Sequence, residues 1–146
     1  MTLNDLSQQI EATKAHTLKS LKHFEFSLGK IKKIPADFDL ENLELLETYE
    51  SFTSRFSRLS DIFSKKLLRS LVLKDDPSFK GGFMDILNQA EKLGFISDAR
   101  KWWEIRSLRN KEAHEYTDED LRQYFNEIKR QSSFVIQEVS TLIKKI

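Results

Sequence analysis

Residues 45–71 read LLETYESFTSRFSRLSDIFSKKLLRSL, and this stretch carries the clearest structural pattern in the chain. Its apolar and aromatic residues recur every three or four positions, a spacing that places them on one face of an α-helix. The set is Leu46, Tyr49, Phe52, Phe56, Leu59, Phe63, Leu67 and Leu71. We predict one unbroken helix of about 33 residues, roughly 50 Å long. Asp37 or Asp39 is expected to cap its first backbone N–H groups.

The same period extends in both directions along the chain. A first helix is expected from about residue 3 to about residue 30, fraying at Gly29. Its stripe is Leu3, Leu6, Ile10, Thr17, Leu21, Phe24, Leu28 and Ile31. A short third helix is expected to begin at Asp76-Pro77, and a fourth is expected to be capped by Ser97.

A last helix is predicted after Thr117, which is followed by three acidic residues. Its apolar stripe has heptad-like spacing and comprises Leu121, Phe125, Ile128, Ser132, Val135, Val139, Leu142 and Ile146. No stretch has the alternation of a strand. The sequence therefore predicts an all-α fold, a four- to five-helix up-and-down bundle forming a single domain over residues 1–146.

Composition narrows the class of protein. The chain has 146 residues, 24 Lys+Arg against 23 Asp+Glu, and no cysteine. Without cysteine there are no disulfides, thiolate zinc sites or thiol nucleophiles. The balanced charge disfavours a broad basic face for duplex nucleic acid. The first ten residues lack the features of a signal peptide, and no apolar run spans a bilayer, so we expect a cytoplasmic protein.

Charge is segregated along the long helix. Four glutamates occupy its first half, Glu41, Glu44, Glu47 and Glu50; five basic residues occupy its second half, Arg55, Arg58, Lys65, Lys66 and Arg69. This order suits the helix dipole, which favours acid at the N-terminus and base at the C-terminus. The basic half is also a candidate strip for contact with RNA or an acidic partner. Both interpretations stay open.

One segment before the last helix combines residues suited to phosphate chemistry: Arg106-Ser-Leu-Arg109-Asn110-Lys-Glu-Ala-His114-Glu-Tyr116. Asn110 and His114 are four apart and can touch on a helix, with Arg106 in the same row. Arg109 and His114 are five apart, about 140° around an ideal helix. Arg109 would therefore reach around Asn110 or pair with His114 across a dimer axis.

Arginine and histidine together permit phosphoryl transfer without a metal ion. Arginine binds phosphate through two N–H groups and stabilises the charge of the transition state. Histidine exchanges protons near neutral pH, and RNA supplies its own nucleophile in the 2′-hydroxyl. Two chains meeting at the motif would double each group, which favours a symmetric dimer. The ordinary alternative is a histidine near a helix C-terminus beside a surface arginine.

The segment Arg109-Asn110-Lys-Glu-Ala-His114-Glu-Tyr116 resembles the Arg-x-x-x-x-His-x-Tyr motif of HepT-type HEPN toxins, as does the predicted helix order. The resemblance implies a HEPN-like helical domain and a metal-independent ribonuclease toxin of a type VII-like toxin–antitoxin pair. Arg109 and His114 would be catalytic, supported by Asn110 and Arg106, with neither metal nor cofactor. An MntA-like minimal nucleotidyltransferase would be the antitoxin and would attach AMP to Tyr116.

Two further interpretations remain open. Nucleotidyltransferase substrate-binding-like proteins have a similar bundle and motif, and the resemblance to them implies a non-catalytic companion of the same partner. An unrelated helical adaptor, with the motif a coincidence, is the third.

Several other residues invite a functional interpretation that the pattern does not favour. His16 and His23 share a helix face, but no third ligand accompanies them. Lys80-Gly81-Gly82 lacks the ending of a phosphate loop. Of Trp102 and Trp103, one is expected in the core and the other at an interface, where it can stack on a base. Tyr49 and Tyr124 are expected in the core.

Overall fold

The computed structural model describes residues 2–111 and 117–146, and all regular structure in this part of the chain is helical. The elements in chain order are α1 (Leu3–Ile31), α2 (Leu43–Asp61), η1 (Ile62–Leu67), α3 (Leu68–Asp75), α4 (Phe83–Lys92), α5 (Ala99–Asn110) and α6 (Asp118–Lys145). The predicted all-α bundle is confirmed, and it is consistent with a HEPN-like helical bundle. No helix among the described residues is both long and apolar enough to cross a membrane.

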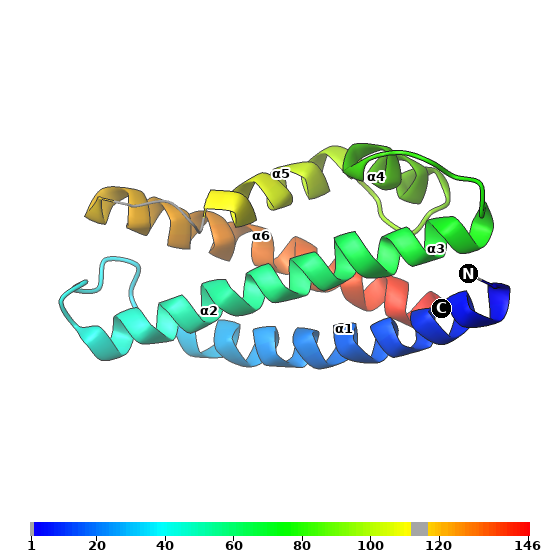
Figure 1. Ribbon diagram of the computed structural model, residues 1–146. Helices are drawn as coiled ribbons and strands as arrows, with labels where there is room; N and C mark the ends of the chain where they lie inside the picture. The colour runs from blue at the N-terminus through cyan, green and yellow to red at the C-terminus, as the bar shows by residue number, and fades with distance from the viewer. Residues whose placement is uncertain (1, 112–116) are drawn as a thin grey trace.

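The long helices run up and down, side by side (Figure 1). α1 runs antiparallel to the α2–η1–α3 helix, and α6 lies behind them, so both chain termini are at one end. The Nζ of Lys14 donates to the backbone oxygen of Ile146 at 2.5 Å, joining α1 to the C-terminus. α6 begins at the opposite end, near the α1–α2 connection. There Arg122 donates to the backbone oxygens of Ala36 and Phe38.

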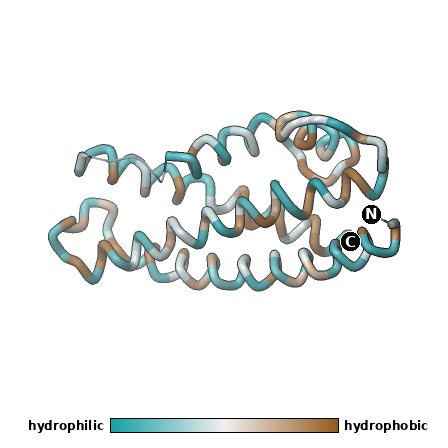
Figure 2. The backbone as a smooth tube through the Cα atoms, in the orientation of Figure 1, coloured by the Kyte–Doolittle hydropathy of each residue, from teal (hydrophilic) through white to brown (hydrophobic). Residues whose placement is uncertain are grey.

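Apolar side chains from all the helices form one core, and the hydrophobic positions recur along each helix between hydrophilic stretches (Figure 2). Phe24 of α1 stacks on Phe52 of α2, with ring centroids 5.3 Å apart. The predicted stripe of α1 is buried except at Leu3, which is 63% exposed because it begins the first turn. Gly29 lies inside α1, which continues to Ile31, so the predicted fraying there is wrong.

The long second helix, predicted as unbroken, is interrupted by a π-helical segment, η1. Successive stripe residues Leu59, Phe63, Leu67 and Leu71 are four apart, and in an α-helix each such step drifts about 40° around the axis. A π-helical turn is wider, so it takes up this drift. All four residues are consequently buried on the core side.

The long helix begins later than predicted, at Leu43, where the side chain of Asn42 accepts from the N–H of Leu45. Asp39 instead accepts from the N–H of Glu41 and closes a turn. The physical reason is the burial of Phe38 in the connection, where it stacks on Tyr49 at 4.8 Å. The chain turns inward to bury Phe38, and a straight helix starting at Asp37 would not contain this turn.

Two other helix starts also differ from the prediction. Asp76 accepts from the N–H of Ser78 in a turn, and α4 begins only after Gly82, whose N–H donates to Asp85. The cap of α5 is Asp98 rather than Ser97, because the N–H of Ser97 donates to Glu138 of α6. Asp76 is therefore part of a turn rather than a helix cap, and Ser97 is engaged by a contact with α6.

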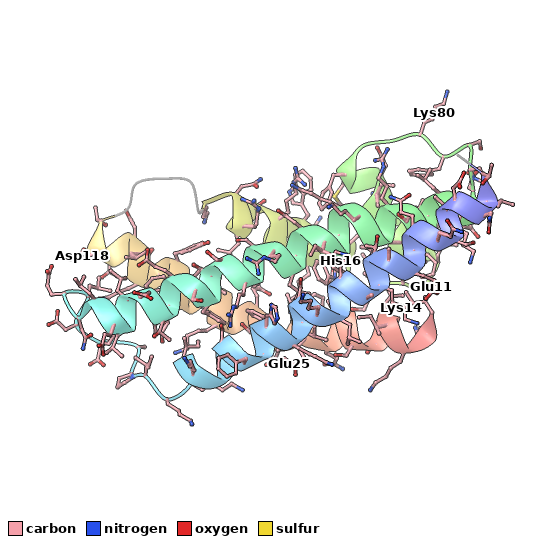
Figure 3. All side chains as sticks on the ribbon, turned by 60° about the horizontal axis from the view of Figure 1, so that its bottom comes forward. Glu11, Lys14, His16, Glu25, Lys80 and Asp118 are labelled. Carbon is pink, nitrogen blue, oxygen red and sulfur yellow. The ribbon has the colours of Figure 1, made fainter. Side chains whose placement is uncertain are left out.

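The start of α6 is as predicted. Thr117 accepts from the N–H of Asp120 at 3.1 Å, and the carboxylate of Asp120 accepts from the N–H of Thr117, which completes a capping box. Asp118 marks the first turn of α6, at the end of the bundle that also holds the α1–α2 connection (Figure 3). The heptad-like stripe of α6 faces the core.

Candidate functional site

The Arg-x-x-x-x-His-x-Tyr motif straddles the junction between α5 and α6. Arg109 and Asn110 form the end of α5, and Asn110 is exposed. His114 and Tyr116 lie outside the described residues. The predicted contact between Asn110 and His114 therefore stays a prediction, as does the relation of Arg109 to His114.

Arg109 is held by a carboxylate from the long helix. Its Nε donates to both oxygens of Asp61, at 3.2 Å to Oδ1 and 3.1 Å to Oδ2. Both side chains are partly exposed, so the pair lies at the rim of the bundle rather than in its core. The one Nε–H is shared between the two carboxylate oxygens, in a charge-assisted hydrogen bond that ties the guanidinium to Asp61. Asp61 therefore orients Arg109 at the end of α5.

Lys65 adds a second positive charge to this cluster. Its Nζ lies 3.7 Å from Oδ1 of Asp61, one helical turn further along. Arg109, Lys65 and Asp61 together carry a net positive charge. Asp61 ends α2, and the π-helical segment that begins at the next residue carries Lys65. π-helical turns are frequent at functional sites. The cluster is suited to attract an anionic group such as phosphate.

Arg106 lies on α5, one helical turn before Asn110. It packs over the ring of Phe83 in α4, with its guanidinium carbon 4.3 Å from the ring centroid. The two residues share a row of the helix, as their spacing predicts, and the supporting role of Arg106 stays a prediction. Its guanidinium is directed to α4, and Arg106 and Lys65 line the same surface groove. Any contribution of Arg106 to the candidate site would come through this groove.

Sequence reasoning did not identify Asp61 as a site residue. A signal was present, because Asp61 is the one acidic residue between Ser51 and Lys74, a stretch that holds the five basic residues of the long helix. A lone carboxylate in such a segment indicates an ion pair. Lys65 is a partner only four residues away, but the other partner, Arg109, is 48 positions away in the sequence. Pattern analysis over one helix does not reach that far.

The predicted burial of one tryptophan and of two tyrosines agrees with the structure. Trp102 is fully buried, and Trp103 is 44% exposed, so one of the two does lie in the core. Tyr49 and Tyr124 are buried, as predicted. His16 is exposed on α1 (Figure 3). Among the described residues, no three His, Asp or Glu side chains gather to hold a metal ion.

Part of this chain is similar to a curated protein. The chain is 31% identical over 78 residues to a protein named Probable ribonuclease HepT from Haemophilus influenzae. The match covers 51% of this chain and 53% of that protein, so the chain spans about half the length of the curated relative it matches. This similarity supports a relation to the HepT-like HEPN family. No family model matches the chain, and no solved structure matches it.

Proposed function

We propose that this protein is a HEPN ribonuclease toxin that cleaves RNA without a metal ion. The proposal rests on the motif Arg109-x-x-x-x-His114-x-Tyr116, which begins at the end of α5, in a chain that is similar to a protein named Probable ribonuclease HepT. The orientation of Arg109 by Asp61 supports it. The protein would act in the cytoplasm as a homodimer, with Arg109 and His114 of two subunits forming one cleft.

The reaction needs two proton transfers and one stabilising charge. His114 takes the proton of the ribose 2′-hydroxyl while that oxygen attacks the neighbouring phosphorus. The bond from phosphorus to the 5′-oxygen breaks, and an imidazolium gives a proton to the leaving oxygen. The products are a cyclic 2′,3′-phosphate and a free 5′-hydroxyl. Arg109 stabilises the charge on the non-bridging oxygens.

The experiment that tests this function is incubation of the purified protein with single-stranded RNA in excess EDTA. We expect cleavage at the rate seen without EDTA, and fragments that end in cyclic phosphate. RNA that stays intact in EDTA but is cut after Mg²⁺ is added would contradict the metal-independent mechanism. Intact RNA under both conditions would contradict the ribonuclease function.

Asp61 is proposed as a positioning residue for Arg109. We expect Asp61→Ala to lower the cleavage rate by about 10- to 100-fold, because misplacing a reacting group by about 1 Å has effects of this size. The free energy of unfolding should change little, since a partly exposed ion pair contributes about 0–1 kcal/mol to it. Asp61→Asn keeps one acceptor oxygen and should be intermediate. A fall in melting temperature without a change in rate would show that Asp61 has only a structural role.

Control of the toxin is proposed to occur at Tyr116. A minimal nucleotidyltransferase partner would transfer AMP from ATP to its hydroxyl, releasing pyrophosphate. The added phosphate would compete with RNA for Arg109 and block the cleft. We expect intact mass to rise by whole AMP units after incubation with the partner and ATP, and RNA cleavage to stop. The same rise in Tyr116→Phe would contradict the assignment.

A second candidate function is that of a non-catalytic companion subunit of the nucleotidyltransferase. The ion pair between Arg109 and Asp61 favours it, because the pair also serves to join α5 to the long helix. This alternative predicts copurification with the nucleotidyltransferase and no growth arrest when the protein is expressed alone. Growth arrest that depends on His114 would exclude it.

A further inference from the structure

A small groove opens beside the Arg109–Asp61–Lys65 cluster. It has a volume of about 230 Å³ and is lined by Ser64, Lys65, Arg69, Phe83, Ile86 and Arg106. One wall is the π-helical segment with the start of α3, and the other is α4 with α5. Lys65 belongs both to this wall and to the cluster that holds Arg109. We call this feature the basic groove.

The charge of the basic groove differs from that of the whole protein. Three of its six lining residues are basic and none is acidic, although the chain as a whole carries a formal charge of only +1. Lys65 and Arg69 are exposed and can turn to a ligand, whereas Arg106 is half-buried. A shallow hollow that shares Lys65 and Arg69 continues along the same helix and includes Lys66. Several cations along one helix can contact the phosphates of a nucleic acid strand.

An aromatic surface borders the groove. Arg106 covers one ring, that of Phe83, and Phe83 contacts Trp103 with ring centroids 6.1 Å apart. Trp103 is 44% exposed, while its neighbour Trp102 is fully buried. A tryptophan this exposed beside cationic side chains is typical of surfaces on which unpaired bases stack. A duplex does not offer such bases, because they are paired and stacked inside it.

We propose that the basic groove and Trp103 bind a single-stranded segment of the RNA next to the cleavage site. Lys65 and Arg69 would contact its phosphates, and Trp103 would stack on one base. The inference rests on the proposed ribonuclease function and adds the form of the substrate, an unpaired strand. It assigns a role in RNA binding to Trp103, which belongs neither to the hydrophobic core nor to the motif.

The test measures binding to a labelled single-stranded RNA of about 12 nucleotides, fully 2′-O-methylated so that it resists cleavage. We expect Trp103→Ala to weaken binding roughly 5- to 150-fold, the range measured for loss of one stacked base. Arg69→Gln should lower the dependence of log Kd on log salt by about 0.7, the contribution of one phosphate contact. A duplex of the same sequence should bind more weakly than the single strand.

Phe26→Ala is the matched control. Phe26 is also an exposed aromatic, 62% accessible, with Lys30 and Arg55 over its ring, but it lies on α1 away from the groove. Its removal should leave RNA binding unchanged. Equal losses from Phe26→Ala and Trp103→Ala, or no loss from Trp103→Ala, would overturn the inference. So would a wild type that does not bind the RNA.

Two further measurements separate the remaining explanations. If Trp103→Ala turns a dimer into a monomer, Trp103 belongs to a protein interface and the inference is wrong. Cleavage of ordinary RNA in EDTA reports on the proposed function separately. If the wild type cleaves RNA but Trp103→Ala binds RNA as tightly as the wild type, RNA binding at the basic groove is contradicted and the ribonuclease function is supported. If RNA binding depends on Trp103 but the wild type does not cleave RNA, binding at the basic groove is supported and the ribonuclease function is contradicted.

Discussion

Replacing His114 with alanine is expected to lower RNA cleavage in EDTA by about 10²- to 10⁴-fold, the usual contribution of a general acid–base group. The variant should keep the helical circular dichroism of the wild type. The reason is that no other group in the motif exchanges a proton readily at neutral pH, whereas arginine stays protonated.

His16→Ala is the matched control, because His16 is an exposed histidine on α1 and belongs to no part of the proposed site. Its cleavage rate should equal that of the wild type. A His114→Ala protein that cuts as fast as the wild type would contradict the catalytic assignment and favour the companion function. Arg109→Lys should also lose most activity, since lysine lacks the planar fork that binds phosphate at two points.

Trp102→Ala should have the largest effect on stability, about 3–5 kcal/mol. Trp102 is fully buried, and its ring lies 4.7 Å from Phe63 and 5.9 Å from Phe134. Its Nε1 donates to Glu138 at 3.2 Å, so truncation also removes a hydrogen bond between α5 and α6. At about 2–4 °C per kcal/mol, the melting temperature should fall by roughly 6–20 °C.

Trp103→Ala serves as the control for this prediction, since the two tryptophans are adjacent on one helix and differ chiefly in burial. We expect its free energy of unfolding to change by no more than about 1 kcal/mol, because only part of the ring is covered. Thermal unfolding followed by circular dichroism compares the two variants. Equal destabilisation by both would mean that Trp103 also contributes to the core.

The helices were predictable because their signal is local. The stripes of α1, the long helix and α6 use spacings of three and four residues, and burial follows them closely. The cap at Thr117 was predictable for the same reason, since its partner Asp120 is three residues away. The start of the long helix was not, because it depends on Phe38 packing against Tyr49 and Phe125.

The candidate site divides in the same way. The motif and the chemistry of Arg109 and His114 follow from residue types and spacing within α5 and the junction after it. The partner of Arg109 does not, because Asp61 lies on another helix and meets it only through the rotation and register of packed helices. The basic groove has the same origin, since its walls come from η1, α3, α4 and α5.

The amino-acid sequence alone was thus sufficient for the all-α class, the order of the helices and the motif at the end of α5. Each of these depends on residues within about one or two helical turns of one another. The packing of the helices determined that Trp102 rather than Trp103 lies in the core, and that the long helix contains a π-helical segment. It also placed Asp61 against Arg109. These outcomes depend on how whole helices fit together, and the spacing within one helix holds no information about its neighbour's register.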